Sequence, residues 1–576
     1  MAVRLEDLDL LRDLALADES VTVDRFTLTV RHWELPELRW SGRMGWLPGV
    51  RSLKTSFPSG NSGRAVVDLE LRSPAPLAMV ARAVYPLLGV ERGLHGHGHL
   101  QLGTAGDLPG NGLALLPSRL APGVPDTIST HLAGVGLSRA DVGLVGSETT
   151  KARFDKDADD PQSTVFRSSL VVDPSGHLAV AERSEFPLVD LNVHNPIGRV
   201  QDFHESKGGV SLTLVGDELV FEPVDSSPID PWSVPARSTL TARAVKRLRH
   251  VECIDLSRLV PLDAETELLL YRRLAELAAT GAVLHSLPDT YLRADDILGP
   301  TLAASMRLAY RPATGLVREL RSVPQRREAM ERFGGFYELA DVVEKSGHRM
   351  LPKVSAVLST MRPDRVSAVL RALAAQHYPH LEVIVAIHGA DGPLPADFES
   401  AARACDAILM LQDRSVPFGT VLAEAAGRAS GDLIVKIDDD DFYGPRVISD
   451  LVLAYLYSNA DVVGKTTEYL YLEAVDQTVH RTFATETYHS QVAGGVMMLS
   501  TAALNEIGGW RPTPNSTDRS ILLRIGNLGG IAYRTQSLGY VYVRHDDGHT
   551  WKRNDSHLVT GSFEQWPRFM DEIVTS

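Results

Sequence analysis

The stretch Asp432-Leu433-Ile434-Val435-Lys436-Ile437-Asp438-Asp439-Asp440-Asp441 joins an apolar run to four consecutive carboxylates. The apolar run predicts a buried strand, and the aspartates follow where that strand would end. Ligands of open α/β sheets bind at the carboxyl ends of the strands. A solvated acidic turn is the alternative, because charge runs usually face water. Four neighbouring carboxylates repel one another unless a cation offsets their charge, so the stretch predicts a divalent-metal and diphosphate site.

The sequence before the aspartates predicts alternating strands and helices. Residues 354–360 and 381–387 are apolar and rich in β-branched side chains, and a helical pattern lies between them. A third short strand is predicted at 407–411, and a helix at 419–429 leads into the strand before the aspartates. Such alternation implies a parallel sheet with right-handed crossovers, so the fold class is α/β.

Several ordered motifs in this region resemble one known family. They are Val354-Ser355-Ala356-Val357-Leu358-Ser359-Thr360-Met361-Arg362-Pro363-Asp364-Arg365, then Ala375-Gln376-His377-Tyr378-Pro379-His380-Leu381-Glu382-Val383-Ile384-Val385, then Ala429-Ser430-Gly431-Asp432. Together with the aspartates they resemble the family 2 glycosyltransferases of the GT-A fold, a Rossmann-like nucleotide-diphospho-sugar transferase fold, over about residues 354–551. The resemblance implies transfer of a sugar from a nucleotide-diphosphate donor to a hydroxyl, with inversion at the anomeric carbon and a Mn²⁺ or Mg²⁺ ion.

The resemblance assigns roles to the aspartates by position. Asp438 and Asp440 match the outer residues of the family's Asp-X-Asp signature, and Asp439 lies between them. Asp440 is expected to bind the metal, Asp438 to meet the metal or the donor's ribose, and Asp439 to lie in the nucleotide-sugar site. Lys436 either approaches a phosphate or is a structural lysine.

A second signature is Ile507-Gly508-Gly509-Trp510, followed by Asp518. In the resembled family, a Gly-Gly-aromatic turn precedes an acidic residue at a helix start, and that acid is the catalytic base. Asp518 matches this position, whereas Thr517 stands where family members often carry a second acid. The alternative is that Asp518 only caps its helix, because aspartate satisfies free backbone amides there.

A third signature follows the strand pattern at 540–543, where His545 and His549 lie. A histidine after the base helix completes the metal shell in some family members, and His545 is the better match. An imidazole ligand favours Mn²⁺ slightly over Mg²⁺. We interpret His549 as a loop hydrogen-bonding residue or a phosphate contact.

The chain departs from the family where the nucleotide base is recognised. In typical members the second strand ends with an aspartate that holds the base, but here His388 and Asp391 follow that strand. Either could substitute for the aspartate. Thr360 and Arg362, at the end of the first strand, are expected to line the same pocket.

The remaining sequence predicts domains rather than function. A chain of 576 residues predicts several domains, which we place at 1–240 (β-rich, accessory), 241–350 (α/β and helical, connecting) and 351–576 (the GT-A domain). Hairpins are predicted at 169–180 and 211–221, a βαβ unit at 250–288, and an antiparallel ribbon from 462–473 and 478–482. Alternating histidines at 95–99 are interpreted as a glycine-rich loop rather than a metal-binding strand.

Composition narrows the setting. Two cysteines argue against a disulfide framework and fit a reducing cytoplasm. The net charge of -15 argues against nucleic-acid binding and against a broad basic membrane patch. The sequence shows no transmembrane run and no signal-peptide pattern. We therefore expect a cytoplasmic protein, or one peripherally associated with the inner face of the membrane.

Three functional interpretations remain. The first is an inverting, metal-dependent glycosyltransferase that modifies a glycan or glycolipid acceptor in surface polysaccharide or glycoconjugate synthesis. The second is a sugar-phosphate nucleotidyltransferase, whose glycine-rich basic first loop is not matched by Thr360-Met361-Arg362-Pro363. The third is a non-catalytic glycan- or nucleotide-binding module with a decayed transferase domain, which the substitutions at Thr517 and at the second strand end favour.

Overall fold

The computed structural model describes most of the chain after residue 208. It describes residues 21–34, 49–58, 62–88, 189–191, 193–199, 208–224, 229–313, 315–334, 351–389, 393–458, 460–527, 530–545 and 555–575, the short pieces 2–5, 101–103, 114–116, 143–145, 168–172 and 178–182, and the single residues 11, 44, 47, 337 and 340. The expectations for residues 95–99, Asp391 and His549 lie outside these ranges.

An eight-stranded sheet forms the centre of the C-terminal part. In sheet order its strands are β17 (Ile408–Gln412), β16 (Leu381–His388), β15 (Val354–Thr360), β18 (Leu433–Ile437), β24 (Val496–Ser500), β20 (Val462–Gly464), β25 (Ala532–Arg534) and β23 (Thr487–Tyr488). The first four are mutually parallel, and β24 runs antiparallel to β18. The predicted strands and the α/β class are confirmed.

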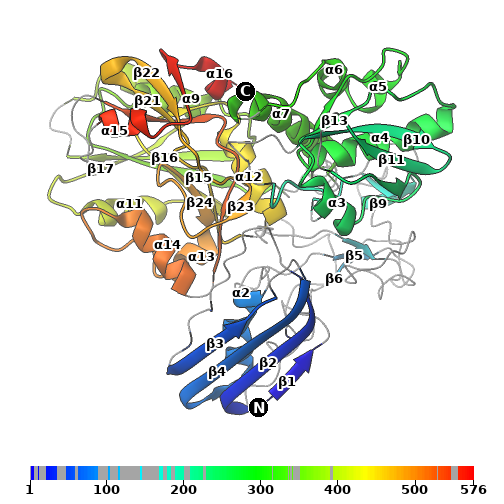
Figure 1. Ribbon diagram of the computed structural model, residues 1–576. Coiled ribbons are helices and arrows are strands. Elements are labelled where there is room, and N and C mark those ends of the chain that lie inside the picture. The colour runs from blue at the N-terminus through cyan, green and yellow to red at the C-terminus, as the bar shows by residue number, and fades with distance from the viewer. Residues whose placement is uncertain are drawn as a thin grey trace.

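Both faces of this sheet are covered by helices (Figure 1). Val435 and Ile437 of β18 face one apolar core, while Ile434 faces the other, as the two-residue period of a strand requires. The first core includes α9 (Ser367–Ala374), α10 (Ala396–Ala404) and α12 (Val447–Ser458). The second includes α11 (Phe418–Ala426), α13 (Thr501–Glu506) and α14 (Thr517–Asn527). Lys436 therefore shares the face of Ile434.

A second sheet lies beside the first. Its strands in order are β19 (Phe442–Tyr443), β26 (Tyr540–Arg544), β21 (Tyr469–Leu472), β22 (Gln477–His480) and β27 (Glu564–Pro567). The short helices of this part are η3 (Glu473–Val475), α15 (Asp555–Thr560) and α16 (Asp571–Thr575). The predicted ribbon is confirmed only in part, because β21 pairs antiparallel with β22, whereas β20 joins the eight-stranded sheet.

A five-stranded sheet organises the region before the C-terminal part. Its order is β12 (Trp232–Pro235), β11 (Glu218–Pro223), β10 (Gly209–Val215), β13 (Cys253–Asp255) and β14 (Val283–His285). Its helices are α3 (Ala242–Leu248), α4 (Ala264–Ala279), α5 (Ala294–Ile297) and α6 (Pro300–Arg307). The β10–β11 hairpin and the parallel β13–α4–β14 unit are confirmed. Strands from both sides of residue 240, where we expected a domain boundary, pair with each other in this five-stranded sheet.

The N-terminal part contains the predicted β-structure. Strands β1 (Ala2–Leu5), β2 (Thr22–Glu34), β4 (Ser62–Pro76) and β3 (Val50–Ser56) form a sheet that packs against α2 (Leu77–Leu88). Strands β8 (Ser168–Val172) and β9 (Leu178–Glu182) form the predicted hairpin. A small sheet joins β6 (Ala114–Leu116), β5 (Gln101–Gly103) and β7 (Gly143–Val145).

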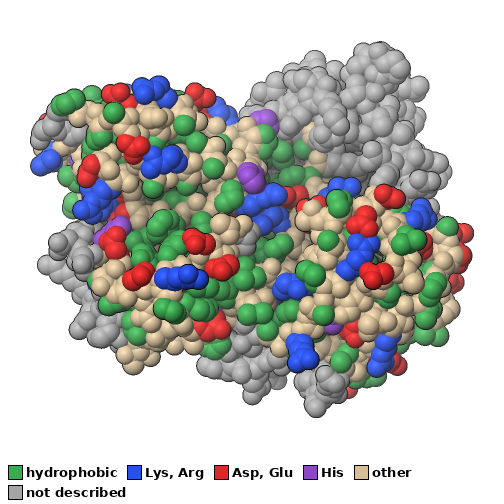
Figure 2. Space-filling model, turned by 90° about the horizontal axis from the view of Figure 1, so that it is seen from above, with side chains coloured by type: hydrophobic (Ala, Val, Ile, Leu, Met, Phe, Trp, Pro, Cys, Tyr) green, Lys and Arg blue, Asp and Glu red, His purple; other side chains and the backbone are tan. Residues whose placement is uncertain are grey.

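The described helices and surface were compared with the expectations about membrane spans and nucleic-acid binding. Among the described residues, every helix is too short or too polar to cross a bilayer. On the face shown in Figure 2, acidic and basic side chains are interspersed with apolar ones over the described residues. Such a mixture differs from the single-sign surface that attracts polyanions.

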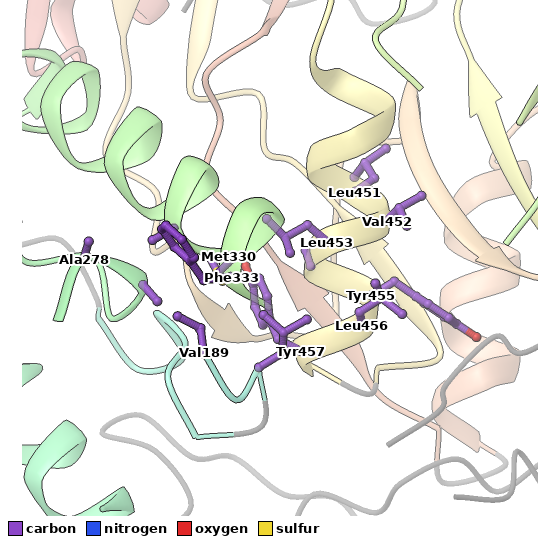
Figure 3. Packing of buried hydrophobic residues seen from close by; sticks show 14 of the residues in the cluster. Val189, Ala278, Met330, Phe333, Leu451, Val452, Leu453, Tyr455, Leu456 and Tyr457 are labelled. Carbon is purple, nitrogen blue, oxygen red and sulfur yellow. The ribbon is translucent and has the colours of Figure 1, made fainter. Parts of the chain in front are cut away.

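Helix α7 (Gly315–Phe333) joins the middle region to the eight-stranded sheet. Met330 and Phe333 of α7 belong to one buried cluster with Leu453 and Tyr457 of α12, and Figure 3 shows the two helices meeting through these side chains. The same cluster includes Ala278 at the end of α4. The middle region and the C-terminal part thus share one core, which couples their stabilities.

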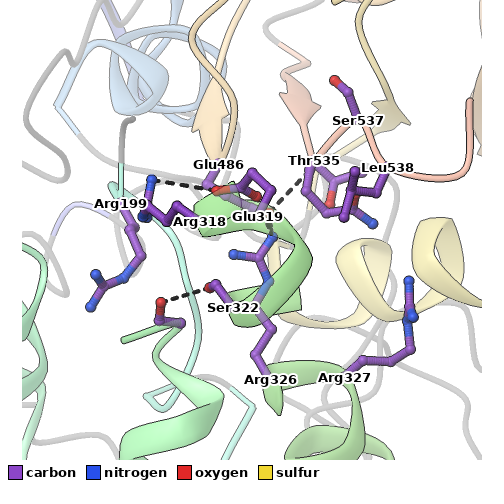
Figure 4. A network of polar contacts seen from close by, with 12 residues as sticks. Arg199, Arg318, Glu319, Ser322, Arg326, Arg327, Glu486, Thr535, Ser537 and Leu538 are labelled. Carbon is purple, nitrogen blue, oxygen red and sulfur yellow. Dashed lines mark hydrogen bonds and ion pairs between the residues drawn. The ribbon is translucent and has the colours of Figure 1, made fainter. Parts of the chain in front are cut away.

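Buried ion pairs accompany this apolar contact, as Figure 4 shows in part. Arg326 of α7 pairs with Glu486, and both side chains are at most 4% exposed. Arg327 donates to Asp450 at 2.8 and 3.1 Å, and the same carboxylate accepts from Lys465 at 3.1 Å. A buried charge that loses its partner is strongly destabilising, so these pairs fix the position of α7.

Candidate active site

The four aspartates lie directly after β18, at the carboxyl edge of the parallel strands. Asp439 and Asp441 are buried, whereas the side chains of Asp438 and Asp440 are 35% and 21% exposed. Of these four aspartates, Asp438 and Asp440 are therefore the two that can reach a ligand in solvent.

Asp439 is held from the end of β15. The Thr360 hydroxyl donates to its Oδ2 at 2.6 Å, and Arg362 donates to both carboxylate oxygens. Burial raises the pKa of Asp439, and the contacts with Arg362 and Thr360 offset part of that rise. The structure thus brings three predicted donor-site residues, Thr360, Arg362 and Asp439, into direct contact.

Arg362 also neutralises the next aspartate. Its guanidinium donates to Oδ2 of Asp440 at 2.7 Å. Among the described residues, Oδ1 of Asp440 and Oδ2 of Asp438 accept no recorded hydrogen bond. Each of these two carboxylates therefore keeps one oxygen for a further ligand.

Asp441 joins the two sheets. Its carboxylate accepts from the Tyr540 hydroxyl at 2.7 Å and from the Val543 backbone N–H at 2.9 Å, both on β26. Burial, followed by the charge of Asp438, raises the pKa of Asp441 well above its usual range. Both of its oxygens are committed to the protein, so its role is structural.

Lys436 connects Asp438 to Asp518. Its ammonium donates to Asp438 at 2.6 Å and to the Gly494 carbonyl at 3.2 Å, and it lies 3.4 Å from Oδ2 of Asp518. The side chain is only 3% exposed. Burial lowers the pKa of Lys436, but the charges of Asp438 and Asp518 outweigh burial and raise it. The lysine is therefore a buried cation between the acid cluster and the candidate base.

Two glycines make this convergence possible. A Cβ at Gly494 would lie 2.0 Å from Oδ2 of Asp518, and one at Gly495 would lie 2.8 Å from carboxylate oxygens of Asp438 and Asp441. The Tyr443 hydroxyl donates to the Gly495 carbonyl at 2.8 Å and fixes this segment. The Gly494-Gly495 pair was visible in the sequence, but nothing there indicated that carboxylates occupy the space.

Asp518 is the second residue of α14, and the Gly-Gly-Trp turn is fastened to the same helix. Arg524 donates to the carbonyls of Ile507 at 2.6 Å and Gly509 at 2.7 Å. Gly508 and Gly509 have φ values of 75° and 69°, which favour glycine. The turn therefore positions α14, and through it Asp518, whose side chain is 29% exposed.

His545, the predicted third metal ligand, contacts a carboxylate outside the acid cluster. The Nδ1 atom of His545 hydrogen-bonds Oε2 of Glu473 at 2.7 Å, because β26 pairs with β21 and continues beside η3. Within the described residues, no group of three His, Cys, Asp or Glu side chains is arranged to hold a metal ion. The expected shell of Asp438, Asp440 and His545 is therefore not assembled, although the two aspartates retain hard oxygen donors. Mg²⁺ is commonly held by one or two carboxylates plus substrate phosphates, so the aspartate pair fits such an ion without His545.

His388 ends β16 and is 5% exposed. Neither of its ring nitrogens has a hydrogen-bond partner among the described residues. Buried polar groups in native proteins are almost always satisfied, so His388 is a candidate ligand contact at this sheet edge.

No protein-family model matches the chain, and no curated protein matches it. Among solved structures, the chain is similar to the mannosyltransferase PcManGT from Pyrobaculum calidifontis in complex with GDP-Man and Mn²⁺, at 17% identity and a TM-score of 0.28, over 34% of this chain and 58% of that one. It is also similar to S. aureus TarS 1-349 in complex with UDP-GlcNAc, at 15% identity and a TM-score of 0.28, over 34% and 60%.

The matched part is less than two thirds of either structure's length. A TM-score of 0.28 is too low to indicate a shared fold.

Proposed function

We propose that the chain transfers a sugar, with inversion, from a nucleotide-diphosphate donor to a hydroxyl acceptor. The observation that carries the proposal is the meeting of the acid cluster and Asp518 around Lys436 at the carboxyl edge of the sheet. The carboxylates of Asp438 and Asp518 are both partly exposed there, so a donor and an acceptor would be held side by side. The motif resemblance supports the same chemistry.

The donor side consists of Thr360, Arg362 and the aspartates. Asp438 and Asp440 would hold a Mn²⁺ or Mg²⁺ ion, which when bound would offset the charge that develops on the departing diphosphate. Arg362 keeps Asp439 and Asp440 in place and adds a permanent positive charge at the same edge. His388 lies at the neighbouring strand end, where it would contact the nucleotide base.

Asp518 is the general base in this proposal. An attacking hydroxyl must lose its proton as it bonds to the anomeric carbon, and a carboxylate within hydrogen-bond reach can accept that proton. Asp518 and Asp438 both contact Lys436 but come from α14 and from the end of β18, so the base and the donor site would approach the reacting carbon from different elements. Inversion requires such separate placement of base and leaving group. We place the acceptor among glycans or glycolipids of surface polysaccharide or glycoconjugate synthesis.

A donor screen tests this proposal. The purified chain is incubated with UDP-, GDP- and TDP-sugars, with and without Mn²⁺, while thermal unfolding and release of nucleotide diphosphate are measured. We expect one nucleotide class to raise the melting temperature in the presence of Mn²⁺ and its sugar donor to be consumed when acceptor is added. Stabilisation without consumption under any acceptor would indicate a binding module instead, and release of pyrophosphate from a nucleoside triphosphate would indicate nucleotidyl transfer.

A further inference from the structure

The buried ammonium of Lys436 has an unusual set of neighbours. Its contacts are Asp438 at 2.6 Å, Asp518 at 3.4 Å and the Gly494 carbonyl at 3.2 Å. These partners come from three separate segments: the end of β18, the start of α14 and the loop before β24. One side chain thus links the acid cluster to the helix that carries the candidate base.

Stability alone does not require charged side chains at positions 436, 438 and 518. Taking an ammonium out of water is costly, and apolar residues of similar volume often replace buried ion pairs without loss of stability. Ile434, on the same face of β18, is apolar and buried. If position 436 alone became aliphatic, Asp438 and Asp518 would lose the cation that they share. Their like charges would then repel each other.

We infer that Lys436 is a positioning residue that holds the Asp518 carboxylate in register with the donor-site carboxylate Asp438. The inference rests on the proposed function and assigns Lys436 a role different from the phosphate contact considered from the sequence. The ammonium fixes the separation of the two carboxylates, and the small residues Gly494 and Gly495 allow them to approach. A misplacement of about 1 Å at a reacting group is enough to reduce a rate by about two orders of magnitude.

Two neutral substitutions test the inference. Lys436→Met keeps the length of the side chain, and Lys436→Gln keeps a hydrogen-bond donor, so at least one of them is expected to fold. In either variant we expect kcat for sugar transfer to fall by about 10- to 100-fold, with the donor KM changed much less. The double variant Lys436→Gln/Asp518→Asn should be no slower than Asp518→Asn alone, because Lys436 acts through Asp518.

Lys465 provides a matched control. Its ammonium is likewise buried, but it contacts a single carboxylate, Asp450 at 3.1 Å, and the carbonyls of Gln536 and Leu538 at 3.0 and 2.8 Å. Lys465→Met loses a buried charge of the same kind. We expect it to lower the unfolding midpoint as Lys436→Met does but to keep kcat within about threefold of the wild type.

An activity-independent cycle measures the linkage itself. Urea unfolding of Lys436→Gln, Asp518→Asn and the double variant should show that the two changes are coupled rather than additive. Additive unfolding midpoints, a wild-type kcat in a folded Lys436 variant, or losses in kcat that multiply with those of Asp518→Asn would each overturn the inference. A wild-type protein that consumes no donor would instead overturn the proposed function, while the unfolding cycle would still report on the linkage.

Discussion

The Thr360 hydroxyl donates a hydrogen bond to Asp439 at 2.6 Å, which ties the end of β15 to the acid cluster after β18. The two strands are neighbours in register, with Leu358 beside Ile437, so their carboxyl ends deliver these residues to one point. Arg362 extends the contact to Asp440 at 2.7 Å. The donor side of the candidate site is thus organised before any ligand arrives.

Asp440→Asn tests the metal assignment. The substitution removes a charge and a hard ligand while leaving the buried Asp439 and Asp441 unchanged, so we expect the fold to persist and Mn²⁺-assisted binding of UDP or GDP to weaken by about tenfold or more. Calorimetry with and without Mn²⁺ measures the effect. Asp397→Asn, at an exposed pair with Arg371, is the control and should bind as the wild type does. Equal Mn²⁺-assisted binding in Asp440→Asn would remove Asp440 from the metal site.

His388→Ala tests recognition of the nucleotide base. Both ring nitrogens of His388 are buried without a recorded partner among the described residues, so a base that hydrogen-bonds them would lose that contact in the variant. We expect the affinity for the preferred nucleoside diphosphate to fall by about 5- to 30-fold, and its preference over other nucleotides to narrow. Competition binding with UDP, GDP and ADP provides the comparison. An unchanged order and strength of binding would place base recognition elsewhere.

His480 predicts a pH-dependent contribution to stability. The buried imidazole hydrogen-bonds Glu468 at 2.9 Å and Glu564 at 3.0 Å. Burial lowers the pKa of His480, but these two carboxylates outweigh burial and raise it above 6.5. Because the folded-state pKa is raised, the contribution is fully present below the unfolded value of about 6.5 and is lost as the pH rises through the folded value.

The measurement is urea unfolding of the wild type and of His480→Gln across that range. We expect the stability advantage of the wild type over His480→Gln to shrink as the pH rises from about 6 to about 9. An advantage that stays constant or grows with pH would show that His480 is neutral in the folded protein.

Glu486→Gln tests the attachment of α7 to the C-terminal part. The Glu486 carboxylate receives Arg326, the Tyr457 hydroxyl at 2.9 Å and the Tyr533 hydroxyl at 2.5 Å, all buried. The variant leaves the buried Arg326 guanidinium with the more distant Glu319, at 4.0 Å, as its remaining ion-pair partner among the described residues, so we expect a loss of about 3 kcal/mol in unfolding free energy. Chemical denaturation measures it. Asp397→Asn is again the control, and a Glu486→Gln protein as stable as that control would contradict the arrangement.

Much of the fold after residue 351 could be predicted, because the sequence patterns that indicate its strands and helices are local. The strands at 354–360, 381–388, 408–412 and 433–437 are β-branched runs separated by helical patterns, and each appears at the predicted place. The prediction of an antiparallel ribbon that includes residues 462–473 was only partly right. The strands at 462–464 and 469–472 are both apolar, and partners far along the chain decide which sheet each strand joins. Val462–Gly464 pairs with β24 and β25, which lie far along the chain.

The residues of the candidate site could be predicted from the sequence, but the contacts between them could not. The aspartates and Asp518 could be singled out from motif spacing, whereas the pairing of Lys436 with Asp518 depends on how α14 packs on the sheet. His545 matched by order along the chain, but the pairing of β26 with β21 places it beside Glu473. Glu473 carries no motif that would have indicated this contact.

The most direct test of the central claim is the transfer rate of Asp518→Asn beside its nucleotide affinity. The account predicts that the variant binds nucleotide and Mn²⁺ nearly as the wild type does but transfers sugar about 10²-fold more slowly or worse, because only the proton acceptor is lost. Asparagine caps a helix almost as well as aspartate, so a capping role alone predicts little change in either quantity. An Asp518→Asn protein that retains most of its transfer rate would contradict the account and leave the acid cluster without its base.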